Sequence, residues 1–211
     1  MLTTLCQTTV VFMFSLLFGA DVSLGKDQVE SVEKSRPLGL YLTHGVSHLN
    51  ASELERLSVG DYAFSVGPGL TYDLPADISL NAEFLLITAS RKDPSDYEDR
   101  RSSQAITKFR QDRLTLGASY KKKLAKNFVL FPEIGMALNR IEVILSEGSY
   151  YLETSERVVG WYAGIGSMIP IKRVFFDFRY KYQALALKME QLGVDQMMFQ
   201  STFLVGFGFV I

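Results

Sequence analysis

Residues 174–187 read VFFDFRYKYQALAL, and residues 198–211 read MFQSTFLVGFGFVI. In both stretches a large apolar or aromatic side chain stands at almost every second position, with charged residues or glycines between. Successive side chains of a β-strand point to opposite faces of the sheet, so this alternation predicts two strands that each have one bulky apolar face. These two segments set the fold class for the rest of the chain.

The same unit, an alternating stretch followed by a turn, repeats from residue 38 onward. The predicted strands are 38–47, 59–72, 78–90, 106–121, 128–143, 158–169, 174–187 and 198–211. Short connections at 73–77, 122–127 and 170–173 alternate with longer polar ones at 48–58, 91–105, 144–157 and 188–197. Such alternation is typical of a closed antiparallel up-and-down transmembrane β-barrel, here all-β with about eight strands.

The content of the two strand faces distinguishes a membrane barrel from a soluble one. One face is bulky and uncharged, and we expect it to face lipid through Phe84, Leu116, Ile134, Phe176, Phe178, Phe203, Phe207 and Phe209. The other face carries glycines and charges. In a soluble lipocalin-like barrel the glycines would face water, where they weaken a strand and pack nothing. A membrane barrel explains both faces, and the lipocalin-like binder is the less favoured alternative.

Six charged residues share the glycine-rich face and are predicted to lie in the barrel interior: Glu83, Arg113, Glu133, Asp177, Arg179 and Lys181. Acids and bases balance, so we expect a structural network in which Glu83 and Glu133 pair with Arg179, Lys181 or Arg113. A proton path or gated pore is the alternative, but side chains just fill an eight-stranded interior. Pro68 and Pro132 lie within predicted strands although they lack a ladder donor.

The N-terminal region is predicted to be a targeting segment. Residues 8–20 (TTVVFMFSLLFGA) form an uncharged apolar run that is too short for a spanning helix, and a buried first strand or helix is the alternative. We expect a signal peptide at 1–25, cleaved after residue 20 or 25, a periplasmic arm at 26–37 and the barrel at 38–211. The only cysteine, Cys6, lies in the leader, so no disulfide is expected.

Composition and motifs argue against several functional classes. The formal net charge of −1 gives no basic face for nucleic acid. No phosphate-binding loop, zinc spacing or nucleophile elbow is present, so we expect no cofactor and no metal. His44 and His48 flank Ser47, but two positions four apart on a strand are about 13 Å apart. An enzyme is therefore not the favoured interpretation.

Two longer connections are candidate binding loops. The segment 91–103 (RKDPSDYEDRRSS) carries Arg91, Lys92, Arg100 and Arg101, which suit the phosphates of lipopolysaccharide as well as a solvated surface. The segment 146–156 (SEGSYYLETSE) carries Tyr150 and Tyr151, which suit a partner or an aromatic girdle.

The segments GWYAGIGSMIPI (160–171), FFDFRYKYQ (175–183) and TFLVGFGFVI (202–211) resemble the small outer-membrane barrels of the OmpA transmembrane-domain, OmpX and opacity-protein type. The resemblance implies a bacterial outer-membrane location and recognition of the terminal strand by the barrel-assembly machinery, although Ile211 stands where that family usually has Phe. The favoured function is a non-enzymatic surface barrel that presents extracellular loops for adhesion, host interaction or envelope integrity, in contact with outer-membrane lipid and lipopolysaccharide. A lipid-A-modifying barrel enzyme is the first alternative, and a soluble periplasmic lipocalin-like binder is the second.

Overall fold

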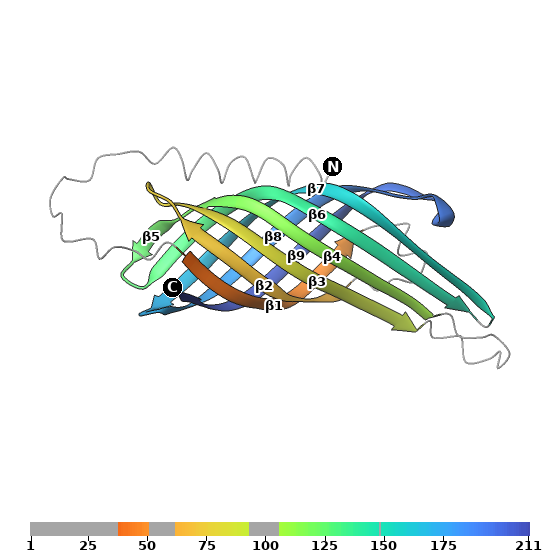
Figure 1. Cartoon of the computed structure of the whole chain (residues 1–211), viewed down its shortest axis with the longest axis horizontal. Coiled ribbons are helices and arrows are strands. Elements are labelled where there is room, and N and C mark those ends of the chain that lie inside the picture. Colours follow the sequence, from red (N-terminus) through yellow and green to blue (C-terminus); the bar gives the residue numbers. More distant parts are fainter. Residues whose placement is uncertain (1–37, 51–61, 93–105, 148) are drawn as a thin grey trace. The chain divides into compact units, whose positions relative to one another are not determined.

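The structure is a computed structural model that describes residues 38–50, 62–92, 106–147 and 149–211 (Figure 1). The predicted signal peptide and arm lie outside these residues. The elements are β1 Leu38–Asn50, β2 Tyr62–Asp73, β3 Ile78–Lys92, β4 Ile106–Tyr120, β5 Lys122–Ala125, β6 Phe128–Glu147, β7 Tyr150–Ile171, β8 Val174–Met189, the 3-10 turn Glu190–Leu192 and β9 Val194–Val210. None of the helical structure in these ranges is long and apolar enough to cross a membrane.

All strand pairs are antiparallel, and the sheet closes on itself. β1 to β4 pair in sequence order, as do β6 to β9, and β1 pairs with β9. β4 and the short β5 both pair directly with β6. The result is a closed eight-stranded barrel in which β5 is an extra short strand. Figure 1 shows long, strongly tilted strands around one interior, as closure of a sheet requires. The predicted fold class is confirmed.

The short strand β5 is a continuation of β4, interrupted by a proline. Ser119 pairs with Glu133 in β6, and Lys122 pairs with Leu130 in the same register. Between Leu130 and Glu133 on β6 lies Pro132, which has no backbone N–H to donate. Pro68 has the same effect, because the β2–β3 ladder has no pairs between Val66–Leu86 and Gly69–Glu83. Each proline is therefore accommodated as a gap in one ladder.

The two ends of the barrel differ. We call the end with the short turns after β2, β5 and β7, where β1 begins and β9 ends, the turn end. Its tight turns use left-handed backbone at Ala76, Asp77 and Lys172. The opposite end is the loop end. There β1 and β3 lead into 51–61 and 93–105, which lie outside the described residues.

Two of the predicted loops at the loop end are wrong. The segment 144–157 is strand, because β6 continues to Glu147 and pairs there with Tyr150 of β7. The segment 188–197 is a tight hairpin in which Met189 pairs with Val194, and Gly193 closes it with φ 65°. Both hairpins keep their backbone groups paired in the sheet, so little loop is left there.

The outer surface carries an apolar belt, which we define by its exposed members: Leu42, Phe64, Leu80, Phe84, Leu114, Leu116, Ile134, Met136, Leu138, Val159, Trp161, Phe176, Phe178, Phe203, Phe207 and Phe209. On β6 the outward positions are apolar from Phe128 to Leu138, and the next two are Arg140 and Glu142. That stretch is about 34 Å long at ~3.4 Å per residue. At a tilt of ~40° it spans about 26 Å, close to the apolar band of membrane barrels.

The polarity of both faces reverses toward the loop end. Beyond the belt, charged residues such as Arg110, Arg140 and Arg157 appear on the outer face, and many inward side chains become apolar. Most of these inward residues belong to one buried cluster, the apolar plug, which also includes Leu85 opposite Arg113 and Leu204 opposite Arg179. Its members are Leu49, Ala63, Leu85, Ile87, Ala89, Phe109, Ile141, Val143, Leu185, Leu187, Met189, Val194, Met198 and Leu204. The loop-end part of the barrel is thus built like a soluble barrel, and the rest like a membrane barrel.

Candidate functional site

The six predicted interior charges lie inside the barrel, and each is at most 4% exposed. We call them the charge network. Lys181 on β8 is its centre: its Nζ donates to Glu83 Oε1 at 2.8 Å and lies 3.6 Å from Glu133 Oε1. Alternating positions place Asp177 and Arg179 beside it on the same strand. Arg179 Nη2 donates to Asp177 Oδ2 at 2.5 Å, and Arg179 Nη1 lies 3.6 Å from Glu83 Oε2.

Arg113 differs from the other two cations, because it forms no ion pair within the described part of the chain. Its Nη1 donates to Gln183 Oε1 at 3.0 Å and to Thr202 Oγ1 at 3.3 Å. It therefore links the network to a neutral polar layer rather than to either glutamate. In that layer Gln111 Nε2 donates to Asn139 Oδ1 at 2.8 Å and to Gln200 Oε1 at 3.1 Å.

Aromatic rings that the sequence analysis did not single out complete the network. The Arg179 guanidinium lies 4.2 Å from the centre of the Tyr41 ring and 5.5 Å from that of Phe131. Arg179 Nη1 also donates to Tyr41 Oη at 2.8 Å, and Lys181 Nζ lies 5.0 Å from the Tyr162 ring. Cation–π contacts of this kind stabilise buried cations that have too few carboxylates. The sequence could have indicated that Tyr41 points inward, because Tyr41 is two residues from Gly39 and alternate residues of a strand share a face.

Glycines make room for these large side chains. A Cβ at Gly69 would overlap the Tyr41 ring, and one at Gly206 would overlap Asp177 Oδ1. Any larger residue at these positions would displace part of the network. This close approach gives a physical reason for glycine on the interior face.

The interior can pair charges and exclude solutes. Toward the loop end the polar layer is followed by members of the apolar plug, of which Val143 and Met198 are fully buried. Within the described ranges no group of three or more His, Cys, Asp or Glu side chains could hold a metal ion.

The residues predicted to face lipid lie on the outer wall. Their exposed fractions are 44% for Phe84, 52% for Leu116, 55% for Ile134, 40% for Phe176, 39% for Phe178, 52% for Phe203, 50% for Phe207 and 47% for Phe209. Such exposure of large apolar residues would be unfavourable in water.

The structure describes the predicted surface-binding residues only in part. Arg100 and Arg101 lie outside the described residues, and Arg91, Lys92 and Tyr150 are placed on strands without a described side chain. Tyr151 lies on β7 rather than at a loop tip and is 62% exposed. Its hydroxyl donates to Glu153 Oε2 at 2.7 Å, and this hydrogen bond raises the pKa of Tyr151 above its usual value.

The Ser47, His44 and His48 group does not come together as a catalytic site. Ser47 is buried in the lumen, where its hydroxyl shares hydrogen bonds with Ser65 and Thr202. His44 is exposed on the outer wall, and the His48 ring packs against Tyr62 at 5.1 Å. The serine and the histidines therefore lie on opposite faces of β1.

The sequence matches no protein-family model and no curated protein. Solved structures match over most of the chain. Neisserial surface protein A is 13% identical with a TM-score of 0.60, over 82% of this chain and 97% of that chain. Ail of Yersinia pestis, in complex with the heparin analogue sucrose octasulfate, is 13% identical with a TM-score of 0.53, over 82% and 96%. OprG of Pseudomonas aeruginosa is 10% identical with a TM-score of 0.51, over 85% and 98%.

The chain has the fold of the small eight-stranded outer-membrane barrels. At 10–13% identity the likeness extends to the fold alone. The exposed apolar belt and the closed ring of strands are features of barrels that span a membrane. The predicted resemblance is confirmed at the level of the fold.

Proposed function

We propose that this barrel is a non-enzymatic outer-membrane surface protein whose loop end acts in adhesion, host interaction or envelope integrity. The filled interior supports this proposal most directly. In the described part of the chain, the buried side chains of the charge network and the apolar plug fill the lumen, which supports a barrel without an aqueous path. Function then resides on the surface, and the loop end is the part that extends past the belt.

Orientation follows the general pattern of such barrels, in which short turns face the periplasm and longer connections face outward. The signal peptide at 1–25 and recognition of β9 by the barrel-assembly machinery belong to the same proposal. Two proteins of similar fold are a neisserial surface protein and an attachment invasion locus protein, the latter in complex with a heparin analogue. Binding of a polyanionic or host partner is consistent with those folds.

The alternative, a lipid-A-modifying enzyme, needs a nucleophile, a base and an orienting acid within mutual reach. Ser47 and His44 are on opposite faces of β1, so the described residues favour the surface barrel.

The test combines localisation of the protein with replacement of the loop-end connection at 93–105. Membrane fractionation and heat-modifiable migration on unboiled gels should place the wild type in the outer membrane as a folded barrel. Replacing 93–105 with a tight turn should leave that behaviour intact and reduce binding to host cells or immobilised heparin. The matched control replaces the turn-end residues 74–77 with another tight turn and should bind normally.

A soluble wild type would contradict the proposal of a membrane barrel. Lipid A that changes mass in a manner dependent on the gene would instead favour the enzyme.

A further inference from the structure

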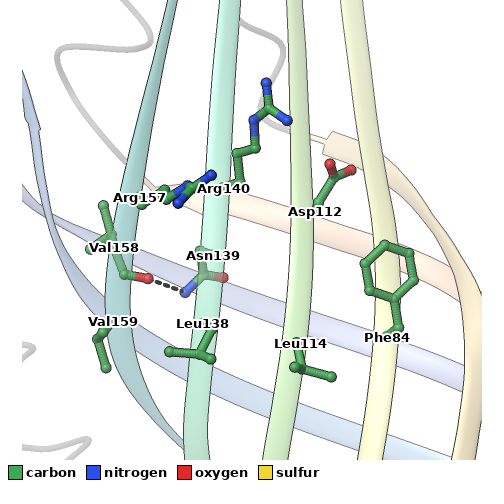
Figure 2. Close-up of a pocket in the computed structure, with 9 residues that line it drawn as sticks. All are labelled: Phe84, Asp112, Leu114, Leu138, Asn139, Arg140, Arg157, Val158 and Val159. Atoms are coloured by element: carbon green, nitrogen blue, oxygen red, sulfur yellow. Dashed lines mark hydrogen bonds between the residues drawn. The ribbon is translucent and has the colours of Figure 1, made fainter.

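Two arginines lie side by side on the outer wall, immediately beyond the apolar belt. Arg140 of β6 is the direct cross-strand partner of Arg157 of β7, and both are exposed. One outward position nearer the turn end, Leu138 and Val159 face each other in the same way. Figure 2 shows the two rows, with Arg157, Arg140 and Asp112 above and Val159, Leu138, Leu114 and Phe84 below. We call Arg140 and Arg157 the arginine pair.

Nearby carboxylates do not fully neutralise this pair. Arg140 Nη2 is 3.9 Å from Glu142 Oε2, at the limit of an ion pair. Asp112, the cross-strand neighbour of Arg140 on β4, is bound by Arg110 Nε at 3.1 Å. Arg157 has no ion pair with any residue that the structure describes. Like charges directly opposite each other destabilise a sheet, so the fold itself does not explain the arrangement.

A shallow pocket of about 300 Å³ joins the charged row to the apolar row. Its lower wall is formed by belt residues and its upper wall by the arginine pair and Asp112. A second shallow pocket continues toward the loop end along Lys108 and Arg110. The wall therefore offers apolar contact below and cations above, which matches an amphiphile with an anionic headgroup.

We propose that the arginine pair binds the phosphate of a phosphorylated lipid in the outer leaflet, whose acyl chains lie on the belt below. Guanidinium groups bind phosphate through two parallel hydrogen bonds, and the pair would present two such groups to one headgroup. Leu138 and Val159 end the belt here, so the pair lies at headgroup level. The proposal rests on the outer-membrane orientation proposed above, and it places the lipid contact on β6 and β7 rather than at 91–101.

The experiment compares lipid binding by the full chain, refolded in detergent, with bisphosphorylated and chemically dephosphorylated lipid A as probes. Native mass spectrometry gives the fraction of barrel with lipid retained. The Arg140→Gln, Arg157→Gln double variant should lose roughly tenfold or more in affinity for the phosphorylated form, because it loses charge-assisted hydrogen bonds. The Lys172→Gln, Arg173→Gln double variant removes the same charge at the turn end and should bind like wild type.

Excess inorganic phosphate should compete only weakly, because it lacks the apolar part. The Arg140 and Arg157 variants should fold, since each substitution removes like-charge repulsion; unboiled gels check this, and the single variants provide a second measurement. Equal binding by wild type and a folded double variant would overturn the proposal, as would equal binding of the two lipid forms. Failure of the wild type to insert into bilayers would instead count against the proposed function.

Discussion

At the scale of single residues, the outward face of β8 tests which side of the barrel meets lipid. Phe178 is near the middle of the belt, and Phe178→Arg places a charge at mid-depth. We expect this change to lower the free energy of unfolding by roughly 2–4 kcal/mol, measured by urea titration in lipid vesicles. Ala186→Arg is the control, because Ala186 is exposed on the same face beyond the belt. Equal stability of the two variants would show that the face assignment is wrong.

The two interior glutamates are expected to differ in importance. Glu83 accepts a hydrogen bond from Lys181 at 2.8 Å and lies 3.6 Å from Arg179, whereas Glu133 is 3.6 Å from Lys181 only. Glu83→Gln removes one carboxylate partner from each of the buried cations Lys181 and Arg179. It should lower the free energy of unfolding by about 3–5 kcal/mol. Glu133→Gln should cost less in the same urea titration. A larger loss for Glu133→Gln would contradict the pairing described here.

At the scale of elements, the sequence predicted strand cores well and strand ends poorly. The alternation of bulky outward residues identified the strands as far as that pattern continued, as from Val174 to Tyr182 in β8. It failed where the pattern reverses. In β6 the inward residues Ile141 and Val143 are apolar while the outward Arg140 and Glu142 are charged. A search for apolar residues on the outer face therefore ended these strands too early.

The charge network was predictable from parity and charge balance, but its pairing was not. Which carboxylate meets Lys181 depends on strand register and tilt around the closed barrel, and a linear sequence does not show either. The contribution of Tyr41 was missed for the same reason, since its ring reaches Arg179 across the lumen from β1 to β8. The role of Pro132 became clear only with the β4–β6 register.

The break between β4 and β5 gives an element-scale prediction. Pro132→Val supplies the missing backbone donor, so β4 and β5 should merge into one strand. We expect unchanged or slightly higher stability, within about 1 kcal/mol, since one hydrogen bond adds little net free energy. Slower amide hydrogen exchange at residues 122–123 is the measurement that checks it, because the Lys121 amide already donates to Asp77. Pro170→Val near the end of β7 is the control. Faster exchange there would show that the proline supports the ladder in another way.

At the scale of the whole molecule, one chain is adapted to two surroundings. Within the belt, lipid covers large apolar side chains and the polar network fills the narrow interior. Beyond the belt, water covers charged side chains and the apolar plug fills the interior. Both parts use the same alternation with a period of two residues. They differ only in whether the outer or the inner face carries the apolar residues. The charged outward residues that begin at Arg140 and Arg157 mark where that exchange occurs.

Because the charge network and the apolar plug both fill the lumen, we predict that the barrel conducts ions poorly. In planar bilayers the purified wild type should give no large, stable single-channel current. A selective pore needs a wider lumen lined by one sign of charge, whereas here three acids and three bases fill the interior, and all three acids pair with Arg179 or Lys181. The plug variant Val143→Ala, Met198→Ala removes bulk from two fully buried positions near the loop end. It should remain non-conducting, because the charge network still fills the centre.

The network variant Arg113→Ser should also remain non-conducting, because the apolar plug is intact. Only the combination of all three substitutions opens space in both layers, so it alone should raise the current. The reason is geometric: two barriers in series must both be lowered before ions pass. Folding of every variant is checked by heat-modifiable migration, so that loss of the barrel is not mistaken for a closed lumen. Large and stable currents from the wild type, or from the plug variant alone, would show that the interior is not sealed in two layers and that transport belongs among the functions of the barrel.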